Sequence, residues 1–127
     1  MPDRITMKGN FQGAFINIKS TLKNVQHSVK EISTDDEKTR KELEKLINQL
    51  SDALQNVPSD KQEEVQAVVE TAKTLVDSAK AEKPNKTMLK ITSEGLKHAA
   101  QNLADVMPTV IPIAGQIALA VMKLVGG

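Results

Sequence analysis

Apolar residues recur every three or four positions along four successive segments of the chain, with polar residues between them. The first two stripes are Phe11, Phe15, Ile18, Leu22, Val25, Val29 and Ile32, then Leu43, Ile47, Leu50, Leu54 and Val57. The other two are Val65, Val69, Ala72, Val76 and Ala79, then Leu89, Thr92, Leu96, Ala99, Leu103 and Val106. Spacings that alternate between four and three residues place each set on one face of an α-helix. The pattern therefore predicts four amphipathic helices.

Polar residues and prolines mark the boundaries between these helices. Thr34 with Glu37 has the spacing of a capping box and predicts the start of the second helix. Ser59 with Gln62, directly after a proline, predicts the start of the third in the same way. A Lys-Pro-Asn break at 83–85 separates the third helix from the fourth.

The breaks are only a few residues long, and short connections make neighbouring helices antiparallel. We therefore expect an all-α fold in one domain, 1–127, built as an antiparallel up-down four-helix bundle over 17–106. Residues 107–127 are expected to add a fifth, apolar C-terminal helix. Alanines in the third and fourth stripes allow these two helices to approach closely.

The C-terminal segment from Val106 to Val125, VMPTVIPIAGQIALAVMKLV, has no polar face to give to water. Prolines at 108 and 112 suit the first turn of a helix, so we expect a helix from about Ile111 to Leu124. Its uncharged part is shorter than the 18 or more residues expected of a membrane-spanning helix. The sequence favours packing against the bundle or in an oligomer, with membrane insertion as the alternative.

Residues 1–16 leave two structures open. Gly9-Asn10 is a pair favoured in tight hairpin turns, and apolar residues flank it on both sides. The same residues could extend the first helix, although each glycine costs a helix roughly 1 kcal/mol relative to alanine. The segment is either a short β-hairpin or a helix extension.

Composition narrows the class of function. The 17 Lys and Arg residues balance 16 Asp and Glu residues, so the chain has no overall field for nucleic acid. With no cysteine there is neither a disulfide nor a thiolate zinc site, which is typical of a reducing compartment. The first ten residues lack the apolar core of a secretory signal. These features predict a cytoplasmic protein, with membrane association through 107–125 as the alternative.

Few residues suggest chemistry. Glu94 and His98 are four residues apart on the fourth helix and could share a metal ion, although an exposed helix pair is the simpler interpretation. His27 lies beside the first stripe. The acidic pairs at 35–36 and 63–64 are each expected in the first turn of a helix, where the helix dipole stabilises negative charge. The sequence therefore predicts no catalytic residues, no cofactor and no metal.

Two further features of the first helix have alternative interpretations. Lys19, Lys23 and Lys30 form a basic stripe, with Lys8 upstream, that could contact phosphates but is expected to be a solvated face. Residues 14–18, AFINI, are an uncharged β-prone run that could pair edge to edge with other chains. Their phase continues the apolar stripe, which favours the start of a helical core instead.

The opening from Gly9 to Leu22, GNFQGAFINIKSTL, precedes Lys-rich amphipathic helices and an apolar tail. This pattern resembles a group of small uncharacterised bacterial helical domains that occur alone or attached to signalling and defence proteins. The spacing of Asn, Phe and Gly is also loosely similar to short amyloid-forming signalling motifs of prokaryotic and fungal cell-death systems. The first resemblance implies a place in a bacterial signalling or defence system. Neither supplies catalytic residues.

We therefore expect a non-enzymatic, self-associating interaction or adaptor module whose partner is a second copy or another protein. Apolar side chains from both ends of the chain are the expected contacts: Phe11, Phe15, Ile18, Val110, Ile111, Ile113, Ile117, Leu119, Val121 and Leu124. The alternative function is a membrane-active effector, pore-forming or membrane-anchoring, that uses the C-terminal segment. No specific nucleic-acid partner is expected.

Overall fold

The computed structural model describes residues 18–126, and every regular element in that range is a helix. Residues 18–29 are helical, and α2 (Glu37–Gln55), α3 (Gln62–Ala79), α4 (Lys86–Gln101) and α5 (Val110–Gly126) follow, with a short 3₁₀ turn, η1 (Ser59–Lys61), before α3. No strand occurs between residues 18 and 126. The predicted all-α class is confirmed. The predicted hairpin or helix extension over 1–16 lies outside the described residues.

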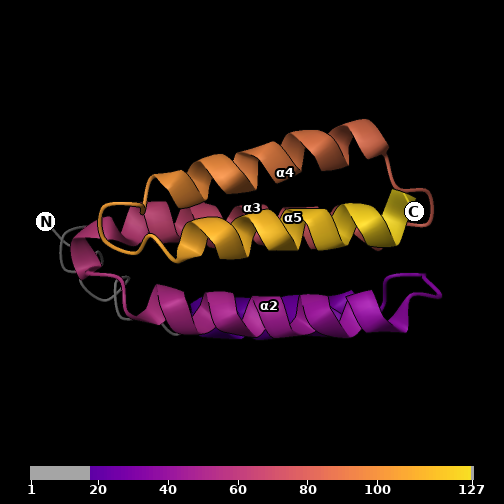
Figure 1. Cartoon of the computed structure of the whole chain (residues 1–127), viewed down its shortest axis with the longest axis horizontal. Coiled ribbons are helices and arrows are strands. Elements are labelled where there is room, and N and C mark those ends of the chain that lie inside the picture. Colours follow the sequence, from indigo (N-terminus) through magenta and orange to yellow (C-terminus); the bar gives the residue numbers. More distant parts are fainter. Residues whose placement is uncertain (1–17, 127) are drawn as a thin grey trace, which may run out of the picture.

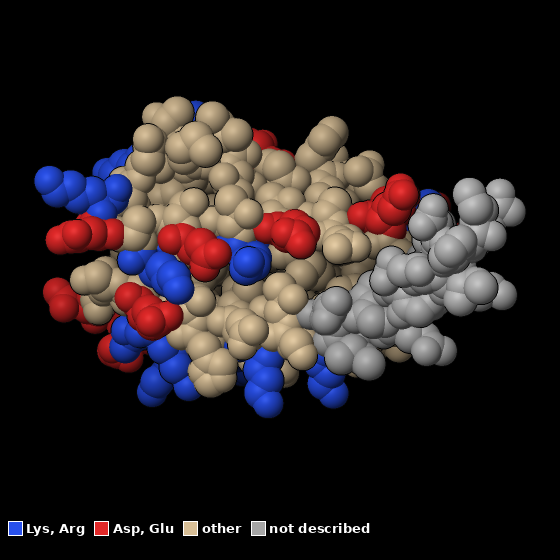
Figure 2. All heavy atoms as spheres, turned by 180° about the vertical axis from the view of Figure 1, so that it is seen from behind, with Lys and Arg blue, Asp and Glu red and all other residues tan. Residues whose placement is uncertain are grey.

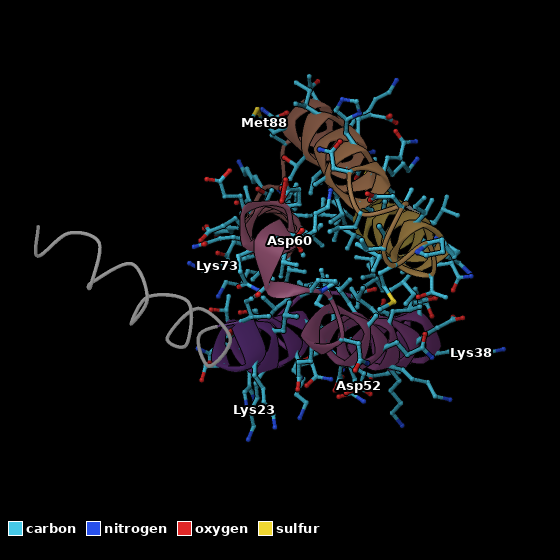
Figure 3. All side chains as sticks on the ribbon, turned by 90° about the vertical axis from the view of Figure 1, so that its left-hand side faces the viewer. Lys23, Lys38, Asp52, Asp60, Lys73 and Met88 are labelled. Atoms are coloured by element: carbon cyan, nitrogen blue, oxygen red, sulfur yellow. The ribbon has the colours of Figure 1, made fainter. Side chains whose placement is uncertain are left out.

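The helices run back and forth along one long axis (Figure 1). α5 lies beside α2 on one side and α4 on the other, and it also contacts α3. Seen end-on, residues 18–29 and α2 form one layer, and α3, α4 and α5 lie above it (Figure 3). A four-helix bundle carrying a separate tail is therefore not confirmed, because α5 shares one continuous apolar core with the other helices.

From Ile18 onward, the apolar residues of the predicted stripes lie in or against this core. Leu43, Ile47, Leu50 and Leu54 of α2 have no exposed surface, and the apolar stripe residues of α3 are equally enclosed. The structure also buries a second row that the heptad pattern left out: Leu46, Val68 and Leu75. A helix that packs on two neighbours needs a wider apolar face than the narrow seam of a two-stranded coiled coil. This requirement explains the second row.

The second helix begins later than the capping box predicts. Asp36 is the N-cap of α2, and its Oδ1 accepts a hydrogen bond of 3.0 Å from the Thr39 backbone N–H. Thr34 lies before the helix, and its hydroxyl oxygen accepts a 3.1 Å hydrogen bond from the backbone N–H of Asp36. The Thr34 and Glu37 pair is therefore wrong as the cap. Asp36 is a better candidate because its carboxylate is a strong acceptor for an unpaired helix N–H group.

The third helix has no capping side chain at all. Ser59 lies in η1, and Gln62 is the first residue of α3, where its side-chain amide is buried without a hydrogen-bond partner. The predicted pairing of Ser59 with Gln62 is therefore wrong. The break before α4 is confirmed, since Asn85 caps that helix by accepting a 3.1 Å hydrogen bond from the Met88 backbone N–H.

The fourth apolar stripe extends beyond the C-terminal end of α4. α4 ends at Gln101, and 102–106 form turns, yet Leu103 is still fully buried while Val106 is half-buried. α5 begins at Val110, close to the predicted start. Pro112 lies in its first turn, where a missing backbone N–H breaks no helical hydrogen bond.

Long-range polar contacts connect neighbouring elements within each layer and between the two layers. Gln26 donates a 2.8 Å hydrogen bond to the backbone carbonyl of Glu44, which joins the first helical segment to α2. Lys80, after the end of α3, lies 3.3 Å from a carboxylate oxygen of Glu31. At the opposite end of the bundle, Lys61 is 3.3 Å from Asp105. The two ion pairs lie at the surface, so each adds little to the free energy of unfolding.

Replacing Leu50 by Asp should unfold the protein. The side chain has no exposed surface, and an unpaired carboxylate there costs several kcal/mol. Lys45→Ala is the matched control on α2, since Lys45 is exposed and its loss should leave the melting temperature almost unchanged. Thermal melts followed by circular dichroism measure both. Equal melting of Leu50→Asp and the natural chain would show that the assigned core face is wrong.

The cap of α2 predicts a pH dependence. Hydrogen bonds from Thr39, first from its hydroxyl and then from its backbone N–H, hold the pKa of Asp36 below its usual 3.8, and the charges of Lys123 and Lys38 act in the same direction. Because the folded pKa lies below the unfolded one, ionised Asp36 stabilises the fold above the unfolded pKa. This stabilisation is lost as the pH falls through the folded pKa.

Thr39→Val removes the hydroxyl donor while keeping the shape of the side chain. The pKa of Asp36 should rise toward 3.8 in an NMR titration of its carboxyl carbon. The variant should lose more stability at about pH 6 than at a pH below the folded pKa of Asp36, where this carboxyl is protonated in both proteins. An equal loss at the two pH values, with an unchanged pKa, would contradict the assigned cap.

Candidate interaction surface

Most of the residues expected to contact other chains lie inside this one. Ile18 and the α5 residues Val110, Ile117, Val121 and Leu124 are buried in the core. Ile111 and Ile113 are partly buried against it. Leu119 is different, with 69% of its surface exposed. Phe11 and Phe15 lie outside the described residues.

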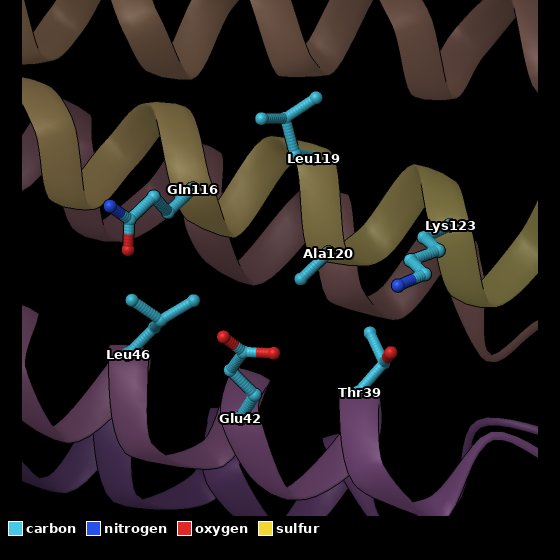
Figure 4. A pocket seen from close by; sticks show the side chains of 7 residues that line it. All are labelled: Thr39, Glu42, Leu46, Gln116, Leu119, Ala120 and Lys123. Atoms are coloured by element: carbon cyan, nitrogen blue, oxygen red, sulfur yellow. The ribbon is translucent and has the colours of Figure 1, made fainter.

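A shallow groove follows the line where α5 meets α2. Thr39, Glu42 and Leu46 line it from α2, and Gln116, Leu119, Ala120 and Lys123 line it from α5 (Figure 4). The residue numbers rise along one helix as they fall along the other, so the two helices are antiparallel. Leu46 and Ala120 are buried, whereas Leu119 points away from α2 at the outer edge. The groove floor is the packed contact between two helices and leaves Leu119 as the exposed apolar residue of this region.

The second exposed apolar position is on α4. Met88 is 49% exposed and Ile91 is 60% exposed, and these two with Leu119 are the exposed large apolar residues in the described part of the chain. Met88 projects from the outer edge of α4, on the side away from α5 (Figure 3). The buried face of α4 is built on Leu89, Leu96 and their neighbours. Met88 and Ile91 lie off that face.

Sequence reasoning missed Met88 and Ile91 as surface residues, although a signal was present. Leu89, Thr92 and Leu96 already complete the stripe of α4. Met88 and Ile91 each come one position before a stripe residue, and on a helix this shift turns a side chain through more than a quarter of a turn. Apolar residues that the stripe does not use are candidates for contacts with something other than the core.

The outer face of α4 continues with polar residues around a glycine. Glu94, Gly95, Lys97, His98 and Gln101 line an open hollow of about 360 Å³. Glu94 lies 3.7 Å from Lys97, one turn away on the same helix. Within residues 18–126, no three side chains of the types that bind metals gather at one place. The alternative interpretation of Glu94 and His98 as a metal-binding pair therefore gains no third ligand from the described residues.

Charges of both signs are interspersed over the lower part of the face seen in Figure 2, whereas the uppermost part, where α4 lies, is largely uncharged. Lys19, Lys23 and Lys30 are all exposed, and Lys23 points away from the bundle (Figure 3). Lys19 and Lys23 share a polar hollow with Asp52 of α2. The basic stripe is therefore interrupted by a carboxylate, which weakens a phosphate site.

The acidic pairs fall at helix starts, as expected, with one shift. Glu63 and Glu64 lie in the first turn of α3. Asp36 is the N-cap of α2 and Asp35 precedes it, so this pair stands before the first turn. All four positions place negative charge near the positive end of a helix dipole.

None of the helices in residues 18–126 has the combination of length and apolar character needed to cross a bilayer. Comparisons of the chain with protein-family models, with curated proteins and with solved structures find no significant match.

Two aliphatic residues of α5 test its orientation. Ile117 is fully buried and Leu119 is largely exposed, although they are only two positions apart. Ile117→Ala should cost about 2–5 kcal/mol, because it leaves a cavity in the core. Leu119→Ala should change stability by less than about 0.5 kcal/mol. Urea denaturation of the two variants gives the comparison. Similar losses for both would mean that α5 does not pack as described.

Proposed function

We propose that this protein is a non-enzymatic interaction module that self-associates through apolar side chains on the outer faces of α4 and α5. The observation that carries the proposal is the exposure of Met88, Ile91 and Leu119, at 49%, 60% and 69%, whereas the other large apolar residues between 18 and 125 are buried or partly buried. The resemblance of residues 9–22 to helical domains of bacterial signalling and defence proteins is in keeping with a role of this kind.

Neighbouring exposed apolar residues contribute more to an interface than isolated ones. One exposed leucine is ordinary on a protein surface. Met88 and Ile91 are three positions apart on one helix, so they form a single apolar patch on the outer face of α4. Covering a large apolar side chain contributes roughly 1.5–3 kcal/mol, which two copies of the patch would double in a symmetric contact.

The membrane-active alternative requires α5 to leave the bundle. Ile117 and Val121 are fully buried, and α5 contacts α2, α3 and α4. Releasing α5 would expose much of the core at once, at a cost comparable with the whole stability of a small domain. The packing of α5 therefore supports the interaction module over the membrane effector.

Sedimentation velocity on the full chain tests the proposal. The weight-average mass should rise with concentration from about 10 µM to about 1 mM, the range in which small interfaces associate. Met88→Ser combined with Ile91→Ser should remove most of this rise while leaving the helical content unchanged, because neither residue belongs to the core.

A mass equal to that of the monomer at every concentration would overturn self-association. Liposome flotation of the same samples tests the membrane alternative. Vesicle binding that depends on residues 110–125, by a protein that stays monomeric in solution, would favour the effector instead.

A further inference from the structure

The layer formed by residues 18–29 and α2 contains a hollow that the proposed self-association does not use. The hollow has a volume of about 260 Å³ and lies between the two helices. Leu22 and Ile47 lie at its base and are almost fully buried, whereas Lys23 and Asp52 at its rim point away from the bundle (Figure 3). Pockets for drug-sized ligands occupy roughly 300–1,000 Å³, so this hollow suits a smaller molecule.

Charges of opposite sign line this hollow from its two sides. Lys19 and Lys23 come from the first helical segment, and Asp52 comes from α2. Neither lysine forms an ion pair with Asp52 or with any other carboxylate of residues 18–126. A simple anion in the hollow would be repelled by Asp52, and a simple cation by the two lysines. A molecule that carries an anionic group and a cationic group can be attracted by both sides at once.

Hydrogen bonds within the chain orient the uncharged polar groups of the hollow. Gln26 Nε2 donates a 2.8 Å hydrogen bond to the backbone carbonyl of Glu44, and Gln55 Nε2 donates a 3.1 Å hydrogen bond to Ser51 Oγ. Each amide is thereby held through its nitrogen, which leaves its carbonyl oxygen as an acceptor. Ser51 accepts through its oxygen and keeps its hydroxyl proton for donation. The hollow therefore offers acceptors to an ammonium group as well as donors to a carboxylate.

We propose that this hollow binds a free α-amino acid, which carries an ammonium group and a carboxylate on one carbon atom. The amines of Lys19 and Lys23 bind the ligand carboxylate, and the Asp52 carboxylate binds the ligand ammonium group. A small aliphatic side chain lies over the apolar base formed by Leu22 and Ile47. The inference goes beyond the proposed self-association and is independent of it, because the hollow and the exposed residues of α4 belong to different layers.

An NMR titration of the full chain with L-valine tests the ligand class. Backbone amides around the hollow should shift with a dissociation constant of about 1 mM, because a small ligand with few contacts binds weakly. Isovalerate is valine without the ammonium group, and isobutylamine is valine without the carboxylate. Each should bind at least tenfold more weakly, because it leaves one side of the hollow unpaired. Binding of isovalerate as tight as that of valine would indicate an ordinary anion site and overturn the proposal.

Neutral variants of similar size test the charged residues. Asp52→Asn should weaken valine binding at least tenfold, and so should Lys19→Gln combined with Lys23→Gln. All three residues are exposed, so the melting temperature should stay almost unchanged. Glu70→Gln and Lys73→Gln are the matched controls, because both residues are exposed on α3 and neither lines the hollow. The controls should bind valine as the natural chain does.

The expected result is valine binding that requires both charged groups of the ligand and is weakened only by the variants in the hollow. The proposal is overturned if no amide shifts up to about 20 mM valine, well above the expected dissociation constant. It is also overturned if the shifts lie elsewhere in the chain, or if the α3 controls lose as much affinity as the hollow variants. None of these results changes the sedimentation test of self-association, so the two proposals succeed or fail separately.

Discussion

The burial of α5 is the constraint on which the rest of this structure depends. The helix is apolar nearly all round, so it must be covered on several sides. The fold meets this demand by placing α5 between α2 and α4 and against α3. The C-terminal helix consequently packs across both layers of the bundle, and its apolar residues are buried within the chain.

This placement determines what is left on the surface. α4 packs on α3 and α5 on one side and has its opposite face open to solvent (Figure 3). Most of the polar residues of α4 lie on that outer face, yet Met88 and Ile91 lie there as well. Neither side chain contributes to the packed core of the monomer. The proposed interface between copies would use these two residues for a contact that the monomer lacks.

The sequence predicts which segments are helical, but it does not predict which helices pack against one another. Apolar periodicity identifies Leu43, Leu50 and Leu96 as core residues because burial of one helix face is a local property of the pattern. Which helices touch is not local. The pattern favoured packing of the C-terminal helix on the bundle or in an oligomer without choosing between them, and it placed Ile117 and Val121 among the contacts between chains, whereas both lie in the core of the single chain. Competition between nearby acceptors explains the misplaced cap, since Thr34 and Asp36 both suit an N-cap and only the packing of α2 decides between them.

Native-state hydrogen exchange is the most direct test of the claim that α5 belongs to the core of the single chain. At concentrations where the protein is monomeric, the amides of residues 114–124 should exchange only through global unfolding, as slowly as those in the middle of α2 and α3. Exchange of α5 that is orders of magnitude faster than that of α2, and that slows only when chains associate or lipid is added, would contradict the account.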